Sequence, residues 1–330
     1  MSKNPTIYYI CFVPPKTGGE QVNLHSVATL CQQGVRAVAL CNLDADPKLS
    51  DVPAHLPLPL EPLQQHRQFN PEDIVVIPEF YREAFAHFAT QPCQRVIHIQ
   101  GPFLSFRGFD SIEQLNAHGF LSGITCSRFG KALMEKMGAK LNWQVVTPTL
   151  HPLFTHRQSS LKKNQIAYMP DKRPKEAPVI RALFQAKYPE FRAIPWIPMI
   201  DMSRQRCAEI MAESTVFASL SYLEGLGLPP LESMASDCLV CGFDGLGGSD
   251  YASEENGLWV QEGDHDGFTH ALAEALRRVN TGDAAFTRQI KAGQQTAQSY
   301  NQERFSQELC SAWQNILGER WINYRNTDPT

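Results

Sequence analysis

Two glutamates that stand eight positions apart, Glu224 and Glu232, have the types and spacing that most clearly suggest chemistry. They lie in SYLEGLGLPPLESMASD (221–237), where a loop with two glycines leads into two prolines. Glycine lets backbone amides approach a ligand closely, and proline is tolerated in the first turn of a helix. A carboxylate only accepts hydrogen bonds, so one carboxylate can take both hydroxyls of a vicinal diol. The stretch therefore predicts a ligand that carries two diols.

A nucleotide sugar has this form, with a ribose at one end, a sugar at the other and a diphosphate between them. Phosphates bind well to helix N-termini, to glycine amides and to cations. The loop 225–228 stands between a predicted strand and a predicted helix, so we expect its amides to point toward such a ligand.

Strand-like and helix-like runs alternate along the chain, which is typical of a parallel α/β sheet with helices on both faces. The expected strands are 7–13, 36–41, 73–78, 95–100, 123–127, 143–148, 164–170, 193–198, 215–221, 238–243 and 258–261. The expected helices are 20–33, 80–89, 128–137, 178–187, 203–213, 266–279 and 302–317, with one more that begins at Pro229.

The length of 330 residues favours two domains, each with its own core. Pro, Ser and basic residues interrupt the alternation at 149–163, so we predict domains at 1–155 and 156–300. In open parallel sheets, ligands bind beyond the carboxyl ends of the strands. Two tandem Rossmann-like domains that face each other would therefore form a cleft for the ligand.

Composition narrows the class of protein. Apolar residues make up 43% and charged residues 19% of the chain, as in a folded globular protein. The net charge of −4 gives no basic field, so nucleic acid is not expected as a partner. The sequence contains no signal-peptide pattern and no apolar run long enough to cross a bilayer, so we expect a cytoplasmic protein.

The nine cysteines lie mostly within apolar runs, which favours reduced thiols in a cytosolic protein over a disulfide framework. Cys238 and Cys241 form a CxxC, but no second pair completes a zinc site.

Residues 215–262 resemble the retaining GT-B glycosyltransferases of the large family with a Glu-x7-Glu motif, glycosyl transferases group 1. The resemblance rests on VFASLSYLEGLGLPPLESMAS, on CLVCGF, on Gly247-Gly248 and on NGLWVQEGD. It continues more weakly in KTGGE (16–20), which resembles a glycine-rich first loop, and in GITCSRFGKALMEKMGA (123–139). The family fold implies an acceptor-side first domain, a donor-binding second domain and a last segment, 301–330, that packs back on the first.

The resemblance also implies roles for particular residues. Glu224 would hold hydroxyls of the donor sugar, and Glu232 would hold the ribose diol. Backbone amides beside the sugar and the diphosphate would come from Gly225, Leu226, Gly227 and Leu228 of the second domain and from Gly18 and Gly19 of the first. The family places an Arg and a Lys against the diphosphate, and the candidates here are Lys172, Arg173 and Lys175. Their spacing departs from the family pattern, which leaves open which of the three meets the phosphates.

Many family members carry a His where the strand RVIHIQ ends near the donor sugar, and here that position holds Gln100. His98 lies two residues earlier on the same face of the strand, either in the site or in the core. Arg107 and Asp110, in the loop that follows, are candidates for an acceptor-side wall.

The implied reaction moves a sugar from a nucleoside diphosphate to a hydroxyl acceptor with retention of configuration. Amides and cations would meet the departing diphosphate, so neither a metal ion nor another cofactor is expected. Such enzymes often build cell-envelope polysaccharide or lipopolysaccharide on glycan or lipid-linked acceptors, so the resemblance implies peripheral membrane contact. The basic clusters 157–163 and 172–175 could touch anionic lipid, but the sequence favours solvated loops for both. Two alternatives stay open, a non-catalytic relative that binds a partner, and a nucleotide-sugar epimerase or hydrolase. The oligomeric state is not indicated.

Overall fold

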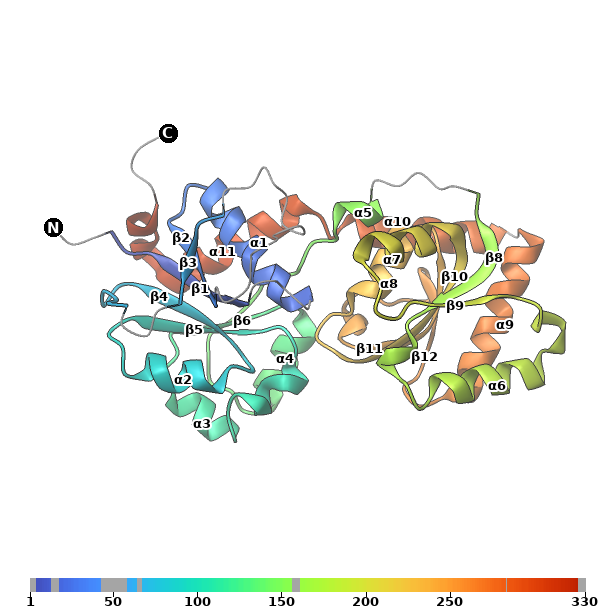
Figure 1. Ribbon diagram of the computed structural model, residues 1–330, viewed down its shortest axis with the longest axis horizontal. Coiled ribbons are helices and arrows are strands. Elements are labelled where there is room, and N and C mark those ends of the chain that lie inside the picture. Colours follow the sequence, from blue (N-terminus) through green and yellow to red (C-terminus); the bar gives the residue numbers. More distant parts are fainter. Residues whose placement is uncertain are drawn as a thin grey trace. The chain divides into compact units, whose positions relative to one another are not determined.

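A computed structural model describes residues 4–12, 18–42, 58–63, 67–155, 161–282 and 284–325, which form two α/β units (Figure 1). Unit 1 contains the described residues of 1–148 and 303–330, and unit 2 contains those of 149–302. The sequence analysis placed these limits at 155/156 and 300/301. Lys16 and Thr17 of the expected first loop, and most of the basic cluster at 157–163, lie outside the described residues.

The described part of unit 1 has a parallel seven-stranded sheet in the order β3-β2-β1-β4-β5-β6-β7. The strands are β1 (Ile7–Phe12), β2 (Ala37–Asn42), β3 (Leu60–Pro62), β4 (Ile74–Pro78), β5 (Gln94–Ile99), β6 (Ser122–Thr125) and β7 (Trp143–Val145). The chain leaves β1 toward β2 on one side and returns to β4 on the other. This reversal of strand order is the position at which open α/β sheets bind ligands.

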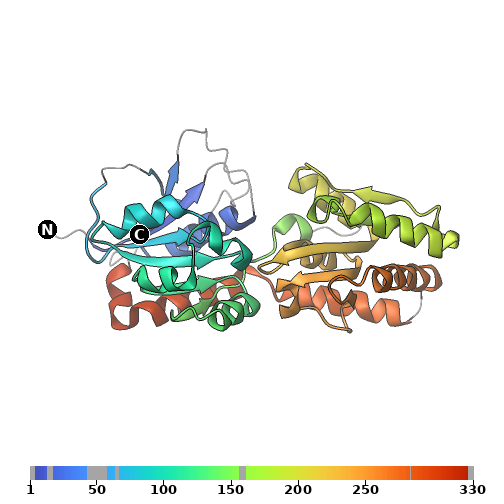
Figure 2. The same ribbon diagram turned by 90° about the horizontal axis from the view of Figure 1, so that it is seen from below.

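Helices cover both faces of this sheet. One face packs against α1 (Gly18–Gln32) and α11 (Gln302–Leu317), and the other against α2 (Arg82–Ala89), α3 (Ile112–Ala117) and α4 (Arg128–Lys136). Figure 2 shows α11 in red within this unit, although it comes from the end of the chain. Trp313 of α11 donates its indole N–H to the hydroxyl of Tyr9 in β1 at 3.2 Å, and Phe305 packs on His25 of α1.

Short elements complete unit 1. They are the 3-10 turns η1 (Pro102–Arg107) and η5 (Gly318–Tyr324). η1 begins directly after the loop that leaves β5, so it belongs to the carboxyl edge of the sheet.

The described part of unit 2 has a parallel five-stranded sheet in the order β12-β11-β10-β8-β9. Its strands are β8 (Lys163–Tyr168), β9 (Trp196–Pro198), β10 (Ser214–Glu224), β11 (Leu239–Leu246) and β12 (Gly257–Val260). Strand order reverses between β8 and β10, so the carboxyl ends of these two strands mark the expected ligand position in this unit.

Helices α6 (Ala177–Lys187) and α9 (His265–Thr281) cover one face of the unit 2 sheet, and α7 (Arg204–Glu213), α8 (Leu228–Ala235) and α10 (Ala284–Gln298) pack on the other side (Figure 1). The remaining elements are α5 (Pro152–Thr155), η2 (Pro170–Lys172), η3 (Pro189–Phe191) and η4 (Gly247–Asp250). The N-termini of α7 and α9 are capped by the side chains of Ser203 and Asp264, which accept from backbone amides three residues later.

Helix α10 was not expected from the sequence. Its fully buried positions are Gln289, Gly293 and Ala297, and its partly buried apolar residues Phe286 and Ile290 pack against the core. Gln289 donates to the carbonyls of Glu254 and Gly257, and a Cβ on Gly293 would lie only 3.2 Å from Met234 of α8. Two apolar side chains, small residues and a buried amide thus hold this helix, which gives it a weak apolar pattern.

All nine cysteine thiols are free. Cys238 lies close to the carbonyls of Met211 and Ser214, and Cys241 is buried within β11. Among the helices of the described residues, none combines the length and the apolar character that a membrane span requires.

Candidate active site

The ends of β8 and β10 bring Lys172 and Glu224 together. Lys172 is the last residue of η2, which follows β8, and Glu224 is the last residue of β10. Nζ of Lys172 lies 2.8 Å from Oε1 of Glu224, with side-chain exposures of 39% and 20%. Oε1 is buried, and the Lys172 ammonium is its charged partner. A carboxylate has lone pairs for several donors, so a ligand hydroxyl could also donate to Glu224.

A β-bulge directs Glu224 away from the sheet. Ser221 pairs with Asp244 and Glu224 with Leu246, so two residues of β10 stand opposite Gly245 of β11. Leu223 has φ 49° and Leu246 has φ 71°, values that are unfavourable for residues with a side chain. The site therefore contains a locally strained turn immediately before its carboxylate.

The glycine loops at this edge are required by close backbone packing. A Cβ on Gly247 would lie 2.5 Å from the carbonyl oxygen of Glu224 and 2.5 Å from the carbonyl carbon of Gly225. Gly227 has φ 84° and stands immediately before the first turn of α8. The hydroxyl of Tyr251, which the sequence analysis did not consider, donates to the carbonyl oxygen of Gly227 at 2.6 Å.

Glu232 lies one turn inside α8 and is partly buried. Burial raises the pKa of its carboxyl to about 7, and the positive charges of Arg204 and Lys172 oppose this rise. Its carboxylate makes no hydrogen bond to another described residue. Both Glu224 and Glu232 therefore interact with the positive charge of Lys172.

The three candidate cations have different surroundings. Lys172 is partly exposed beside Glu224, and Lys175 is exposed and forms no ion pair with the described residues. Arg173 is 3% exposed and pairs with Glu176 and Glu262. Only Lys172 of the three combines access with a position beside a predicted ligand-binding carboxylate.

Glu176 connects Arg173 to the start of α9. Its Oε2 lies 2.7 Å from Nε2 of His265, and both of its oxygens accept from Nη1 of Arg173. The hydrogen bond from His265, followed by the bond from Arg173, lowers the pKa of the Glu176 carboxyl. Glu176 thus stays ionised at neutral pH.

In unit 1, His98 and Gln100 converge on Asn23 of α1. Asn23 donates to the carbonyl of Ile10, which makes its Oδ1 the acceptor for Nδ1 of His98 and for Nε2 of Gln100, each at 2.8 Å. His98 is 2% exposed, and burial lowers the pKa of its imidazole to about 4, so the ring is neutral at pH 7. Its Nε2 is buried and has no hydrogen-bond partner among the described residues.

Gln100 is partly exposed at the carboxyl end of β5, in contrast to His98. A Cβ on Gly19 would lie 2.4 Å from Oε1 of Gln100, so glycine at 19 leaves room for this side chain. Gly18, the first residue of α1, is exposed.

Glu79 is a buried carboxyl group that the sequence analysis missed. It follows β4, is 2% exposed, and its Oε1 accepts from the backbone amides of Gln100 at 3.2 Å and Gly101 at 2.7 Å. Burial raises its pKa to about 7. A glutamate directly after the apolar run DIVVIP was the available signal.

Arg107 and Asp110, the predicted acceptor-side pair, are both exposed. They do not pair with each other. Arg82 donates two hydrogen bonds to the Asp110 carboxylate, at 3.0 and 2.7 Å, and one to the carbonyl of Arg107 at 3.2 Å. The guanidinium of Arg82 lowers the pKa of Asp110. The role of an acceptor wall stays a prediction.

The chain contains two Asp-x-Asp sequences that bear on metal binding. Asp44-Ala45-Asp46 lies outside the described residues, and Asp264-His265-Asp266 opens α9. There Asp264 caps the helix and Asp266 pairs with Lys187. In the described ranges no group of three or more His, Cys, Asp or Glu is arranged to hold a metal ion.

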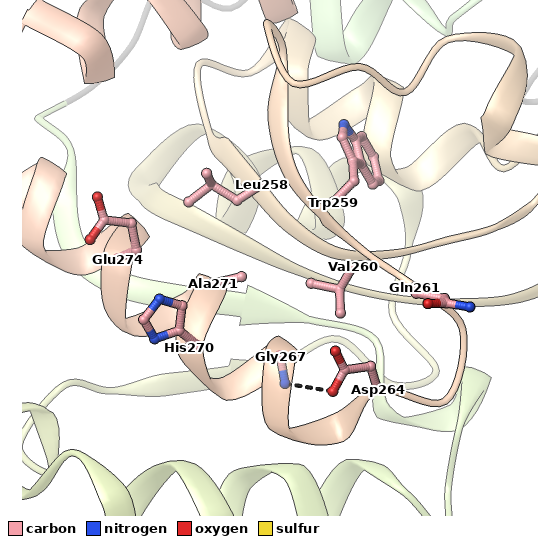
Figure 3. A pocket seen from close by; sticks show the side chains of 9 residues that line it. All are labelled: Leu258, Trp259, Val260, Gln261, Asp264, Gly267, His270, Ala271 and Glu274. Carbon is pink, nitrogen blue, oxygen red and sulfur yellow. Dashed lines mark hydrogen bonds between the residues drawn. The ribbon is translucent and has the colours of Figure 1, made fainter.

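A groove with a volume of about 330 Å³ lies between the edge strand β12 and α9 (Figure 3). Strand residues such as Leu258 and Val260 line one side, and His270 and Glu274 of α9 line the other. None of the predicted site residues lines it.

The comparisons with known proteins agree with this architecture. The model of a family described as glycosyl transferases group 1 matches residues 200–292, which include both glutamates. An alpha-1,6-glucosyltransferase of Actinobacillus pleuropneumoniae serotype 7 (strain AP76) is 28% identical over 325 residues, or 96% of this chain and 97% of the relative.

Two solved structures cover 94% of this chain at 14% identity, each with a TM-score of 0.67. They are HepE of Anabaena in complex with UDP and sucrose-phosphate synthase of Thermosynechococcus elongatus, matched over 100% and 99% of their lengths. The predicted fold class, two parallel-sheet α/β domains of the GT-B type, is confirmed. Together the similarities support a glycosyltransferase with this fold.

Proposed function

We propose that this chain transfers glucose from a nucleoside diphosphate to a hydroxyl group of a glycan acceptor during the synthesis of a cell-envelope polysaccharide, with retention of configuration. The observation that carries the proposal is the pair of glutamates at the strand-order reversal of unit 2: Glu224 is ion-paired with Lys172, and Glu232 lies within the influence of the same lysine.

Glu224 is the proposed contact for the sugar. Its side chain is 20% exposed, and sugar hydroxyls can donate to the carboxylate when the Lys172 ammonium turns to the phosphate. Glu232 is the proposed contact for the ribose, because its carboxylate makes no hydrogen bond to another described residue. A diol that donates to the ionised form of Glu232 would offset the cost of its burial.

Lys172 is the proposed partner of the diphosphate. When phosphate oxygens approach, its ammonium can exchange the Glu224 carboxylate for them, while Glu224 turns to the sugar hydroxyls. Charge that develops on the leaving diphosphate is then stabilised by a cation already in place. In this proposal the backbone amides of 225–228 complete the phosphate environment, and no metal ion takes part.

In unit 1 we propose Gln100, with Gly18 and Gly19, as the donor-side contacts. His98 is neutral and enclosed, and its bond to Asn23 orients it, so we assign it a supporting position beside Gln100. Arg107 and Asp110 stay the proposed acceptor-side residues.

The choice of glucose rests on the curated relative, which is named as an alpha-1,6-glucosyltransferase, and on a structure of HepE in complex with UDP-glucose. The proposed acceptor is a sugar hydroxyl, since the name of the relative denotes an α-1,6 linkage, from C1 of glucose to a 6-hydroxyl.

Thermal-shift measurement against a panel of nucleoside diphosphates and their glucose conjugates tests the proposal. A ligand that binds the native state raises the midpoint of unfolding by mass action, and glucose transfer to glycans is then assayed with the selected donor. A selective shift followed by transfer with retention of the α-configuration is the expected result. Folded protein that shifts with no nucleotide of the panel would support the non-catalytic alternative. Conversion of the donor to another nucleotide sugar would support the epimerase.

A further inference from the structure

Arg173 is enclosed at the carboxyl edge of the unit 2 sheet, and its side chain is 1% exposed. A guanidinium carries five N–H donors. Nε and Nη2 donate to the carbonyl of Ser221 at 3.3 and 3.0 Å, and Nη1 donates to both oxygens of Glu176 at 3.1 and 2.9 Å. Nη2 also donates to Glu262 at 2.5 Å. Five protein contacts thus match the five donors.

The same guanidinium lies over two aromatic rings. Its central carbon lies 4.5 Å from the ring centre of Tyr222 and 4.3 Å from that of Phe243, within the range of cation–π contacts. A phosphate that bound Arg173 would have to displace a carboxylate or the Ser221 carbonyl from a buried cation, at a substantial cost.

The contacts of Arg173 meet at the start of the β-bulge that carries Glu224. Ser221 is the last β10 residue in regular register before the slip, and Leu223, with φ 49°, lies between Ser221 and Glu224. Strained backbone persists only where its surroundings hold it. Two hydrogen bonds from Arg173 to the Ser221 carbonyl, with the guanidinium packed on Tyr222, provide that hold.

We propose that Arg173 is a positioning residue that holds the Ser221–Leu223 turn and so directs Glu224 toward the sugar. This inference rests on the donor role proposed for Glu224. Of the two adjacent cations, Lys172 alone contacts the diphosphate. Glu176 and Glu262 serve this role by fixing the guanidinium. The neighbouring cations in the sequence thus have separate functions.

Lysine cannot replace arginine in this position. It has the same charge but only three donors on one atom and no planar group to stack on aromatic rings. Arg173→Lys therefore tests geometry at constant charge. Arg278→Lys is the matched control, because Arg278 also bonds a glutamate and a glutamine, Glu274 and Gln289, at the α9–α10 contact.

The first experiment measures the Kd of UDP and the kcat and KM for UDP-glucose, well below the unfolding midpoint of each variant. For Arg173→Lys we expect a UDP Kd within threefold of the wild type, with a kcat at least tenfold lower and a higher KM. A UDP Kd that rises tenfold in step with the loss of kcat would overturn the proposal, as would unchanged kinetics. Arg278→Lys is expected to change neither quantity.

A second variant, Glu262→Gln, removes a negative charge and keeps the rest of the site. If Arg173 bound phosphate, the loss of its competing carboxylate would tighten UDP binding. The proposal instead expects an unchanged UDP Kd and a lower kcat. It also expects Glu262→Gln to add little to Arg173→Lys in the double variant, because both act on the same guanidinium.

Arginine labelling with phenylglyoxal provides a measurement that does not need turnover. Peptide mapping should show Arg173 unmodified, with or without inorganic pyrophosphate, while the exposed Arg192 is modified. Modification of Arg173 that pyrophosphate suppresses would assign it to the phosphate. Absence of glucose transfer by the wild-type protein would contradict the proposed function. Labelling of Arg173 would instead contradict its proposed enclosed, positioning role, so the two failures are distinguishable.

Discussion

Lys172 and Glu224 form an ion pair across the reversal of strand order in unit 2, with 2.8 Å between Nζ and Oε1. Each group comes from a different strand end, β8 for the lysine and β10 for the glutamate. The contact neutralises the two charges that the proposed reaction uses separately. Donor binding is therefore expected to exchange one partner for phosphate and the other for sugar hydroxyls.

Substitution of Lys172 tests this exchange. For Lys172→Met we expect kcat for glucose transfer to fall about 100-fold, the size seen when one stabilising group at a developing negative charge is removed. Lys175→Met is the matched control, because Lys175 is exposed and forms no ion pair with the described residues, and it should retain activity within twofold. Steady-state kinetics decide between them. A larger loss of kcat in Lys175→Met would show that Lys175, and not Lys172, contacts the diphosphate.

The two glutamates should separate the two ends of the donor. Glu232→Ala is expected to weaken the nucleoside diphosphate and its sugar conjugate alike, by at least about tenfold, because hydrogen bonds to a charged group contribute ~1.5–3 kcal/mol each. Glu224→Ala should spare the nucleoside diphosphate and weaken only the conjugate. Isothermal titration calorimetry with both ligands measures this. Equal losses for both ligands in both variants would contradict the assignment.

The pH dependence of stability should report the burial of Glu232. Its pKa is raised from 4.5 to about 7 in the native state, so the stabilising effect of its protonation is present below pH 4.5 and is lost as pH rises through 7. Glutamine does not ionise, so the Glu232→Gln variant does not lose this stability as pH rises. We expect the variant to match the wild type near pH 4 and to be more stable at pH 8, by on the order of 1 kcal/mol. Chemical denaturation at both pH values checks this, and a constant difference between them would rule it out.

Gly247 should tolerate no side chain, since a Cβ there would lie 2.5 Å from the Glu224 carbonyl oxygen. Gly247→Ala is expected to lower stability by ~1–3 kcal/mol, as overpacking does, and to weaken binding of the glucose donor. Gly138→Ala is the control, because Gly138 has φ 92° but no atom near its Cβ position. Strain alone should lower the stability of this control and leave donor binding unchanged. Normal donor binding in Gly247→Ala would show that Glu224 does not depend on this packing.

Removal of metal ions tests the proposal that no metal ion takes part in glucose transfer. Glucose transfer is expected to persist after treatment with EDTA. Loss of activity that Mn²⁺ restores would overturn this expectation. The Asp44→Asn and Asp266→Asn variants would then show which Asp-x-Asp sequence holds the ion.

The alternation of short apolar strands with helices predicted the parallel α/β sheets, because a strand buried on both faces reads as a continuous apolar run. The position of Glu224 and Glu232 around a glycine loop also follows from the local sequence, since strand, loop and helix are adjacent in the chain. Helix α10 and the short strand β3 were missed. The inward face of α10 has only Phe286 and Ile290 as large apolar residues beside Gln, Gly and Ala, and a three-residue edge strand carries little periodic signal.

The sequence by itself determined that three cations stand together at 172–175, but it did not determine which of them is accessible. Arg173 finds its acceptors in Ser221 and Glu262, 48 and 89 residues away, and Glu79 finds its donors in Gln100 and Gly101. Such pairings depend on which strand ends the sheet order brings together, and that order is set by long-range packing. The sequence thus determined which charged residues are present near the site. The tertiary structure determined which of them are enclosed by other groups and which remain accessible to a ligand.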